Sequence, residues 1–227
     1  MTAMTTSTTR RVRSIGTVLT IALLASGCAA GERESPASPA EPVRAYLEAI
    51  AAGDARTAWS LDDLALRITS AGPDDLDLET LRTDDVLEGA VERISTVEVA
   101  DPVSDERRDP VDVDYSYTLA GEDYSGALTV AWDSKTQEWQ LQEALSGRLA
   151  VQASTGDDDG DAVPIGFALP GSTVVAAADA ASEYVAYPAV YEITADLDAA
   201  SDDVWMATVL DGQRTLTDYR VSPDEAP

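Results

Sequence analysis

The chain has 227 residues, of which 42 are acidic, 15 are basic and none is histidine, so its formal net charge is -27. Without histidine there is no Ser-His-Asp or Cys-His catalysis and no imidazole metal site, and a single cysteine excludes an internal disulfide and a thiolate zinc site. The negative charge also disfavours nucleic acid as a partner, because phosphate binding relies on lysine and arginine.

Residues 1–27 are typical of an export signal. Three arginines within residues 10–13 precede a short apolar run at 15–25, IGTVLTIALLA. This run is too short to span a bilayer comfortably, which takes roughly 20 apolar residues. Small residues then lead directly into Cys28, the only cysteine of the chain. The sequence therefore predicts a signal peptide that ends just before Cys28.

This junction resembles the lipobox of bacterial lipoproteins, and the residues that carry the resemblance are LASGC at 24–28. The resemblance implies that the Cys28 thiol takes a diacylglycerol and that the signal is cut before it. The commonest lipobox has leucine three residues before the cysteine, where this chain has Ala25. An ordinary cleaved signal and an uncleaved anchor helix are the alternatives. Residues 28–40, polar and proline-containing, are predicted to form a lipidated tether.

Residues 41–153 are predicted to form an α+β domain. Apolar residues at helical spacing between 43 and 50 predict a helix that ends at Gly53, and Asp54 suits the cap of a second short helix through 61. A third helix is expected at 84–95. The apolar period then changes to two, which predicts strands at 111–119, 122–132, 138–142 and 147–153. Helices packed on a curved antiparallel sheet follow from this order.

The helix, Gly-Asp turn and helix in VRAYLEAIAAGDARTAW, with later strands that end in a Trp-x-Leu pattern, are similar to the nuclear transport factor 2-like (cystatin-like cone) superfamily. The resemblance covers residues 42–151. It implies a cone-shaped domain that serves in bacteria as a ligand-binding cup, an enzyme or an extracellular spacer.

Tyr46 is the one weak catalytic candidate. It stands eight residues before Asp54 of the Gly-Asp turn, and in ketosteroid-isomerase-like members of this superfamily a tyrosine at that spacing donates to the developing enolate oxygen. Such an enzyme also needs a carboxylate base and a second acidic donor. No aspartate aligns with those roles, because the nearby Asp62, Asp63, Asp74 and Asp75 are expected in solvated acidic segments. The competing interpretation places Tyr46 in the core.

An acidic linker is predicted at 154–162, STGDDDGDA. Its Asp157, Asp159 and Asp161 are weak candidates for calcium ligands. With Gly160 at the glycine position of an EF-hand loop, the last ligand would be Gly166, where a glutamate is needed, so the match fails. No metal site is therefore assigned, and a solvated linker is the favoured interpretation.

Residues 163–227 are predicted to form a small β-sandwich-like, all-β module. Short apolar strands follow one another, the pair Asp211-Gly212 predicts a hairpin between strands at 204–210 and 214–221, and Pro170-Gly171 supplies another turn. Tyr184, Tyr187 and Tyr191 do not share one face of a straight strand. Sheet packing is therefore favoured over a carbohydrate-binding platform.

These features together favour a non-catalytic binding or interaction protein, lipid-anchored through Cys28 on the extracytoplasmic face of the bacterial cell membrane. Its expected partners are the membrane and a protein of the envelope, with no nucleic acid and no cofactor. Catalysis would rest on carboxylates, hydroxyls, tyrosine or the lone Lys135. A small-molecule-binding cup or an isomerase-like enzyme using Tyr46 is the alternative function, and a calcium-responsive envelope protein is a third.

Overall fold

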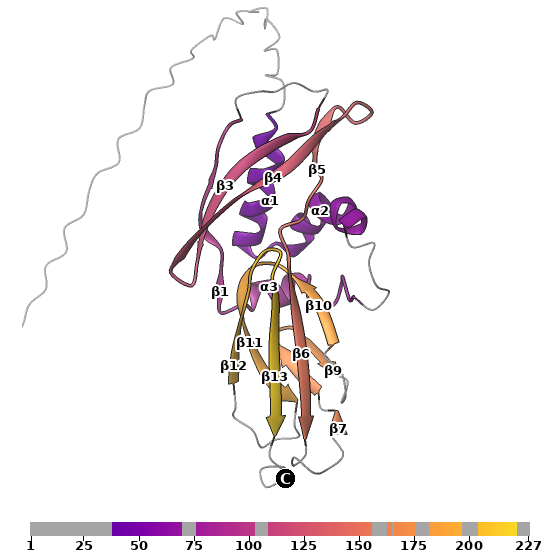
Figure 1. The fold of residues 1–227 in the computed structure, drawn as a ribbon, viewed down its shortest axis with the longest axis vertical. Coiled ribbons are helices and arrows are strands. Elements are labelled where there is room, and N and C mark those ends of the chain that lie inside the picture. The colour runs from indigo at the N-terminus through magenta and orange to yellow at the C-terminus, as the bar shows by residue number, and fades with distance from the viewer. Residues whose placement is uncertain are drawn as a thin grey trace, which may run out of the picture. The chain divides into compact units, whose positions relative to one another are not determined.

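A computed structural model describes residues 38–69, 76–102, 109–155, 163–164, 166–175, 182–196 and 204–221. Residues 36–227 form one compact unit with α+β structure (Figure 1). The unit contains three helices and a curled antiparallel sheet, and further strands come later in the chain. Within the described ranges, no helix is long and apolar enough to cross a membrane.

Helices α1 (Ala40–Ala52) and α2 (Ala55–Thr69) form the predicted helical pair, although α2 is longer than predicted. Gly53 ends α1 with φ at 87°, a left-handed conformation that glycine adopts without strain. Asp54 then caps α2, because its carboxylate accepts the backbone N–H of Thr57 at 2.9 Å. The Gly-Asp turn therefore works as the sequence predicts.

The helix predicted at 84–95 is much shorter in the structure. Helix α3 spans only Asp84–Glu88, and Thr83 caps it by accepting the Val86 N–H. The chain then extends into strand β1 (Glu92–Arg93), which pairs with strand β11 (Ala189–Asp196). Strand pairing and a glycine at position 89 thus outweigh the helical spacing of the apolar residues.

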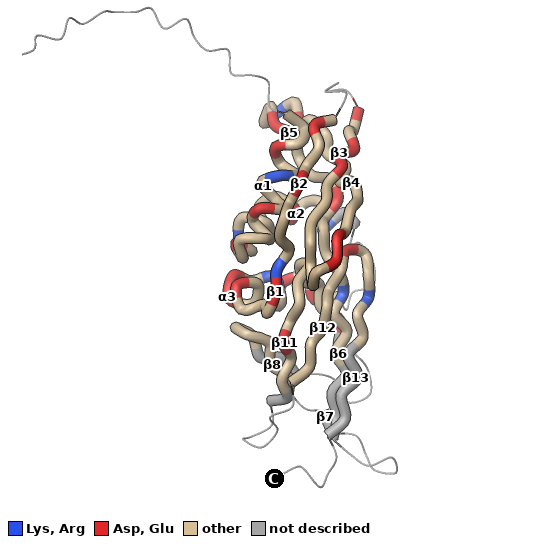
Figure 2. The backbone as a smooth tube through the Cα atoms, turned by 90° about the vertical axis from the view of Figure 1, so that its left-hand side faces the viewer, with Lys and Arg blue, Asp and Glu red and all other residues tan. Residues whose placement is uncertain are grey.

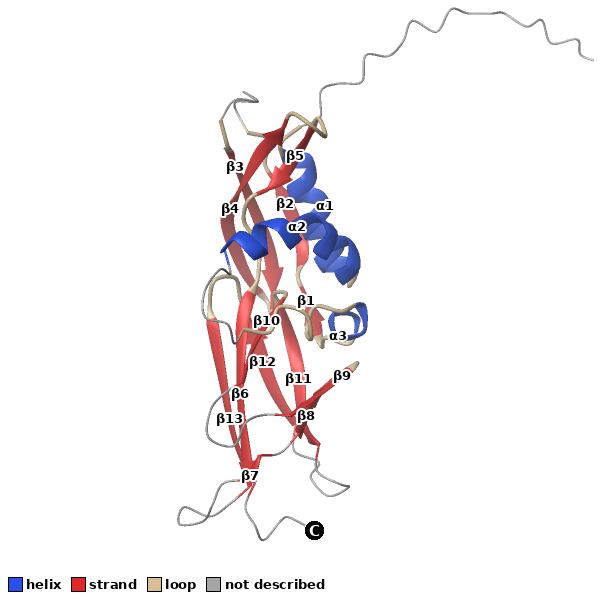
Figure 3. Ribbon diagram, turned by 90° about the vertical axis from the view of Figure 1, so that its right-hand side faces the viewer, coloured by secondary structure: helices blue, strands red, loops and turns tan. Residues whose placement is uncertain are grey.

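Four antiparallel strands build the curled sheet: β2 (Ser95–Val99), β3 (Val111–Leu119), β4 (Glu122–Asp133) and β5 (Glu138–Leu141). The alternation predicted for β3 is confirmed. Its odd-numbered residues from 113 to 119 are buried, whereas Asp112 and Asp114 are exposed. Helices α1 and α2 cover one face of this sheet (Figure 3). Acidic residues are spread over helices and strands alike (Figure 2).

The later strands form two further sheets. One holds β6 (Gly147–Thr155), β7 (Val163–Pro164), β10 (Ser182–Ala186) and β13 (Arg214–Val221). The other holds β8 (Gly166–Leu169), β9 (Ser172–Val175), β12 (Val204–Val209), β11 and β1. Gly171 makes the predicted turn between β8 and β9, with φ at 77°.

The hairpin predicted around Asp211-Gly212 is wrong, although the turn itself forms. Gly212 has φ at 63°, as a tight turn requires. However, β12 pairs with β11, whereas β13 pairs in parallel with β6. The turn is therefore a corner that carries the chain from one sheet to the other.

Strand β6 connects the two predicted domains. The sequence assigned residues 147–153 to the first domain, but β6 pairs with β10 and β13 from the C-terminal segment. β6 also runs on to Thr155, inside the predicted linker. Strand β1 crosses in the same way, because it pairs with β11. A single buried cluster accordingly contains residues from both segments, including Leu47, Val113, Leu149, Tyr187 and Val209.

Candidate functional site: a buried tyrosine, aspartate and arginine network

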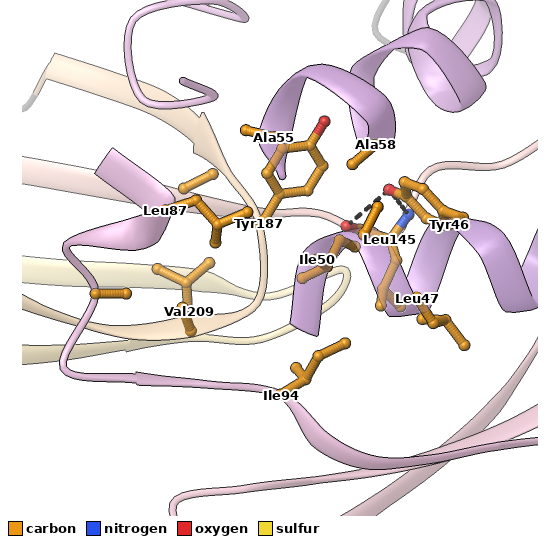
Figure 4. Close-up of a cluster of buried hydrophobic side chains, with 14 of the residues drawn as sticks. Tyr46, Leu47, Ile50, Ala55, Ala58, Leu87, Ile94, Leu145, Tyr187 and Val209 are labelled. Atoms are coloured by element: carbon orange, nitrogen blue, oxygen red, sulfur yellow. Dashed lines mark hydrogen bonds between the residues drawn. The ribbon is translucent and has the colours of Figure 1, made fainter. Parts of the chain in front are cut away.

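Tyr46 lies in the interior of the unit formed by residues 36–227. Its side chain projects from α1 and is fully buried, and its hydroxyl donates to Asp62 Oδ2 of α2 at 2.8 Å. The same oxygen accepts the Leu145 N–H at 3.0 Å and lies 3.2 Å from the Leu145 carbonyl oxygen (Figure 4). The core position of Tyr46 is therefore confirmed, and its hydroxyl is fully occupied by protein groups.

The expectation that Asp62 lies in a solvated segment is wrong. Asp62 is fully buried and forms an ion pair with Arg82. It falls on the apolar stripe of α2, four residues after Ala58 and three before Ala65, both of which are buried. Had helix α2 been extended past residue 61, this spacing would have placed Asp62 inside.

Arg82 is also charged and buried, with an exposed fraction of 3%. Its guanidinium donates to Asp62 and to the Tyr187 hydroxyl, the latter at 2.8 Å. Its central carbon also lies 4.4 Å from the Trp59 ring centroid and 4.8 Å from the Tyr187 ring centroid. Two aromatic faces thus flank the cation, an arrangement that stabilises a desolvated guanidinium. No sequence pattern marked Arg82 as buried.

Tyr187 joins the network from the C-terminal segment, between β10 and β11. Its ring is fully buried and meets Tyr46 edge to face, with the centroids 6.4 Å apart. Figure 4 shows it in the same buried cluster as Ala55 and Ala58 of α2. Tyr184 and Tyr191 are also buried, which confirms the prediction of packing for all three tyrosines.

Burial is the largest cause of the pKa shifts of Tyr46, Asp62 and Tyr187. Burial and the charge of Asp62 raise the pKa of Tyr46 well above its usual range. Burial also raises the pKa of Asp62, although Arg82 and Tyr46 oppose this shift. Burial and Asp62 raise the pKa of Tyr187 as well. A tyrosine of raised pKa, bonded to protein groups, donates a structural hydrogen bond at neutral pH.

Other predicted site residues lie elsewhere. Lys135 is exposed in the turn between β4 and β5. Cys28 and the candidates Asp157, Asp159 and Asp161 lie outside the described residues. Within the ranges that are described, no group of three or more His, Cys, Asp or Glu side chains could hold a metal ion. Tyr46 does not line the three hollows at Asp211, at Ser116 and at Asp84, all formed by described residues, although Arg82 and Trp59 line the last of these.

No protein-family model matches the chain, and no curated protein or solved structure matches it either. The fold and the buried network therefore define the chain only as an α+β protein whose interior is cross-linked by polar side chains. The nuclear transport factor 2-like and lipobox resemblances stay predictions.

Proposed function

We propose that the protein is a non-catalytic binding or interaction protein, lipid-anchored through Cys28 and exposed on the extracytoplasmic face of a bacterial cell membrane. The support for the anchor lies in the sequence: three arginines, a short apolar run, small residues and then the only cysteine. A polar tether follows, which would hold the folded unit away from the lipid surface.

The observation that supports a non-catalytic role is that the hydroxyl of Tyr46 is buried and hydrogen-bonded to protein groups. A general acid must reach a substrate within hydrogen-bonding distance, about 2.6–3.2 Å. The hydroxyl of Tyr46 instead bonds to Asp62 and Leu145, and its side chain is fully buried. The carboxylate beside it is held by Arg82. Through Arg82, these interactions link α1 and α2 to Tyr187 of the C-terminal segment. We therefore assign them a structural role in stabilising the fold.

The finer architecture belongs to the same proposal. Residues 41–153 would supply a cone-like domain of the nuclear transport factor 2-like type, and residues 163–227 would supply strands for a small all-β module. Since β6 pairs with β10 and β13, that module would include residues 147–155. Loops between the two would then present the binding surface.

Cell fractionation tests the anchor. We expect the wild-type protein in the membrane fraction and its folded unit degraded when protease is added to intact cells. Cys28→Ser removes the only thiol, so we expect it to lose stable membrane retention, because two acyl chains give stable anchoring. Ser35→Ala, a change in the tether, is the matched control and should behave as wild type. Unchanged retention of Cys28→Ser would contradict the proposal.

A further inference from the structure

A groove of about 470 Å³ opens where the curled sheet meets the sheet that contains β6. Its walls come from α2, from β4, from the loop between β5 and β6, and from the turn between β12 and β13. Its volume lies within the range of small-molecule sites, roughly 300–1,000 Å³. Loops carried by rigid strands are also where binding residues commonly lie.

Two carboxylates, one from the loop between β5 and β6 and one from the turn between β12 and β13, line this groove. Glu143 is exposed and lines the groove. Asp211 accepts the Ser146 N–H at 3.1 Å, which fixes its orientation at the turn. The two groups are close enough for the charge of Glu143 to add to the effect of burial, and both raise the pKa of Asp211. A ligand cation would relieve this repulsion.

The groove also carries arginine side chains. Arg214 is engaged, because its Nε lies 2.7 Å from Glu183 Oε1. Arg148 forms a longer ion pair with the same Glu183. Its nearest carboxylate oxygen, Glu183 Oε2, lies 3.9 Å away, and its side chain is 52% exposed. The planar guanidinium of Arg148 therefore keeps N–H donors for a ligand carboxylate.

The rest of the lining is mixed, because apolar side chains lie there together with polar residues such as Ser146 and Gln213. Leu66, Leu76, Leu128 and Val185 line the groove, together with Ala127 and Ala144. A ligand that fits would carry a cation for Glu143 and Asp211, a carboxylate for Arg148 and a compact body for the apolar part of the lining. These are the properties of a short peptide with free termini.

We propose that this groove binds a small zwitterion of the short-peptide class, with its amine at Glu143 and Asp211 and its carboxylate at Arg148. The assignment rests on the proposed binding function and names its ligand chemistry. Binding is non-covalent and involves no reaction step.

Isothermal titration calorimetry of the full chain in detergent micelles tests the assignment. The probes are trialanine, N-acetyl-trialanine and trialanine amide, which differ only in their terminal charges. We expect trialanine to bind and each capped form to bind about tenfold more weakly, as the loss of one charge-assisted contact implies.

Two variants assign the ends of the ligand. Arg148→Gln should abolish the preference for trialanine over its amide, and Glu143→Gln should reduce the preference for trialanine over its N-acetyl form. Arg56→Gln and Glu138→Gln, exposed changes outside the groove, are the matched controls and should keep both preferences. Circular dichroism checks that each variant is folded.

Three results would overturn the assignment: no heat of binding, equal binding of all three probes, or the same loss in the control variants. None of them bears on the anchor, because the fractionation of Cys28→Ser is read independently. Loss of peptide binding with intact membrane retention would therefore contradict the groove and leave the proposed anchoring in place.

Discussion

Arg82 and Asp62 carry opposite charges into the interior of the unit, where desolvation is costly. Removing an ion pair from water costs several kcal/mol per ion, and the attraction between the ions offsets this only with good geometry and further hydrogen bonds. Here Tyr46 donates to Asp62, and Arg82 donates to Tyr187. Each partner therefore needs the other, since either charge alone would be left buried without compensation.

This dependence predicts non-additive mutations. Asp62→Leu or Arg82→Met alone should lower the free energy of unfolding by about 3–5 kcal/mol, because one buried charge loses its partner. The double variant should lose less than the sum of the two, since no charge is left buried. Urea unfolding of the four proteins measures the coupling. Additive losses would show that the two side chains act independently.

Asp54 makes a contribution to the free energy of unfolding that decreases at acid pH. Hydrogen bonds from the side chain and backbone of Thr57 lower the pKa of Asp54. In the unfolded chain this carboxyl titrates near its usual value of about 3.9. The stability that it contributes is therefore present above roughly pH 4 and is lost as pH falls through the lower pKa of the folded state.

Asp54→Asn should flatten that acid loss, because asparagine caps a helix without titrating. Melting temperatures measured by circular dichroism from neutral to acid pH give the profile. Asp114→Asn, an exposed change on β3, is the matched control and should keep the wild-type slope. Parallel profiles for wild type and Asp54→Asn would contradict this role.

At the scale of elements, β6 fits closely against the corner between β12 and β13. A Cβ atom at Gly147 would collide with the Leu210 carbonyl oxygen and with the Val209 side chain. Gly147→Ala should therefore destabilise the protein by about 1–3 kcal/mol, as overpacking does. Gly121→Asn is the control, since Gly121 has φ at 76° with open space around it, and asparagine tolerates that conformation. Equal unfolding midpoints for Gly147→Ala and wild type would contradict this packing.

Local patterns predicted some elements well. The Gly53-Asp54 turn and the alternation of β3 depend on residues that are close in sequence, so local patterns are enough to predict them. The helix at 84–95 failed because β11, almost a hundred residues later, pairs with β1. The hairpin at Asp211 failed for the same reason, because β13 pairs with β6. Asp62 was missed because its partner Arg82 carried no local signal of burial.

At the scale of the whole molecule, residues 36–227 form one compact unit, and one core cluster draws on both predicted domains. We therefore expect one cooperative unfolding transition. A variant that keeps Trp139 of β5 as the only tryptophan reports on the first predicted domain, and another that keeps Trp205 of β12 reports on the second. Their fluorescence midpoints in urea should coincide after correction for the stability of each variant by circular dichroism. Two separated midpoints would show that the predicted domains unfold independently.

The proposed function requires that this unit be attached to the membrane through Cys28. The most direct test is the mass of the N-terminal peptide of protein purified from the membranes of the producing cells. We predict a peptide that begins at Cys28 and carries a thioether-linked diacylglycerol. A peptide that retains the residues before Cys28, or one that begins elsewhere without lipid, would contradict the proposal.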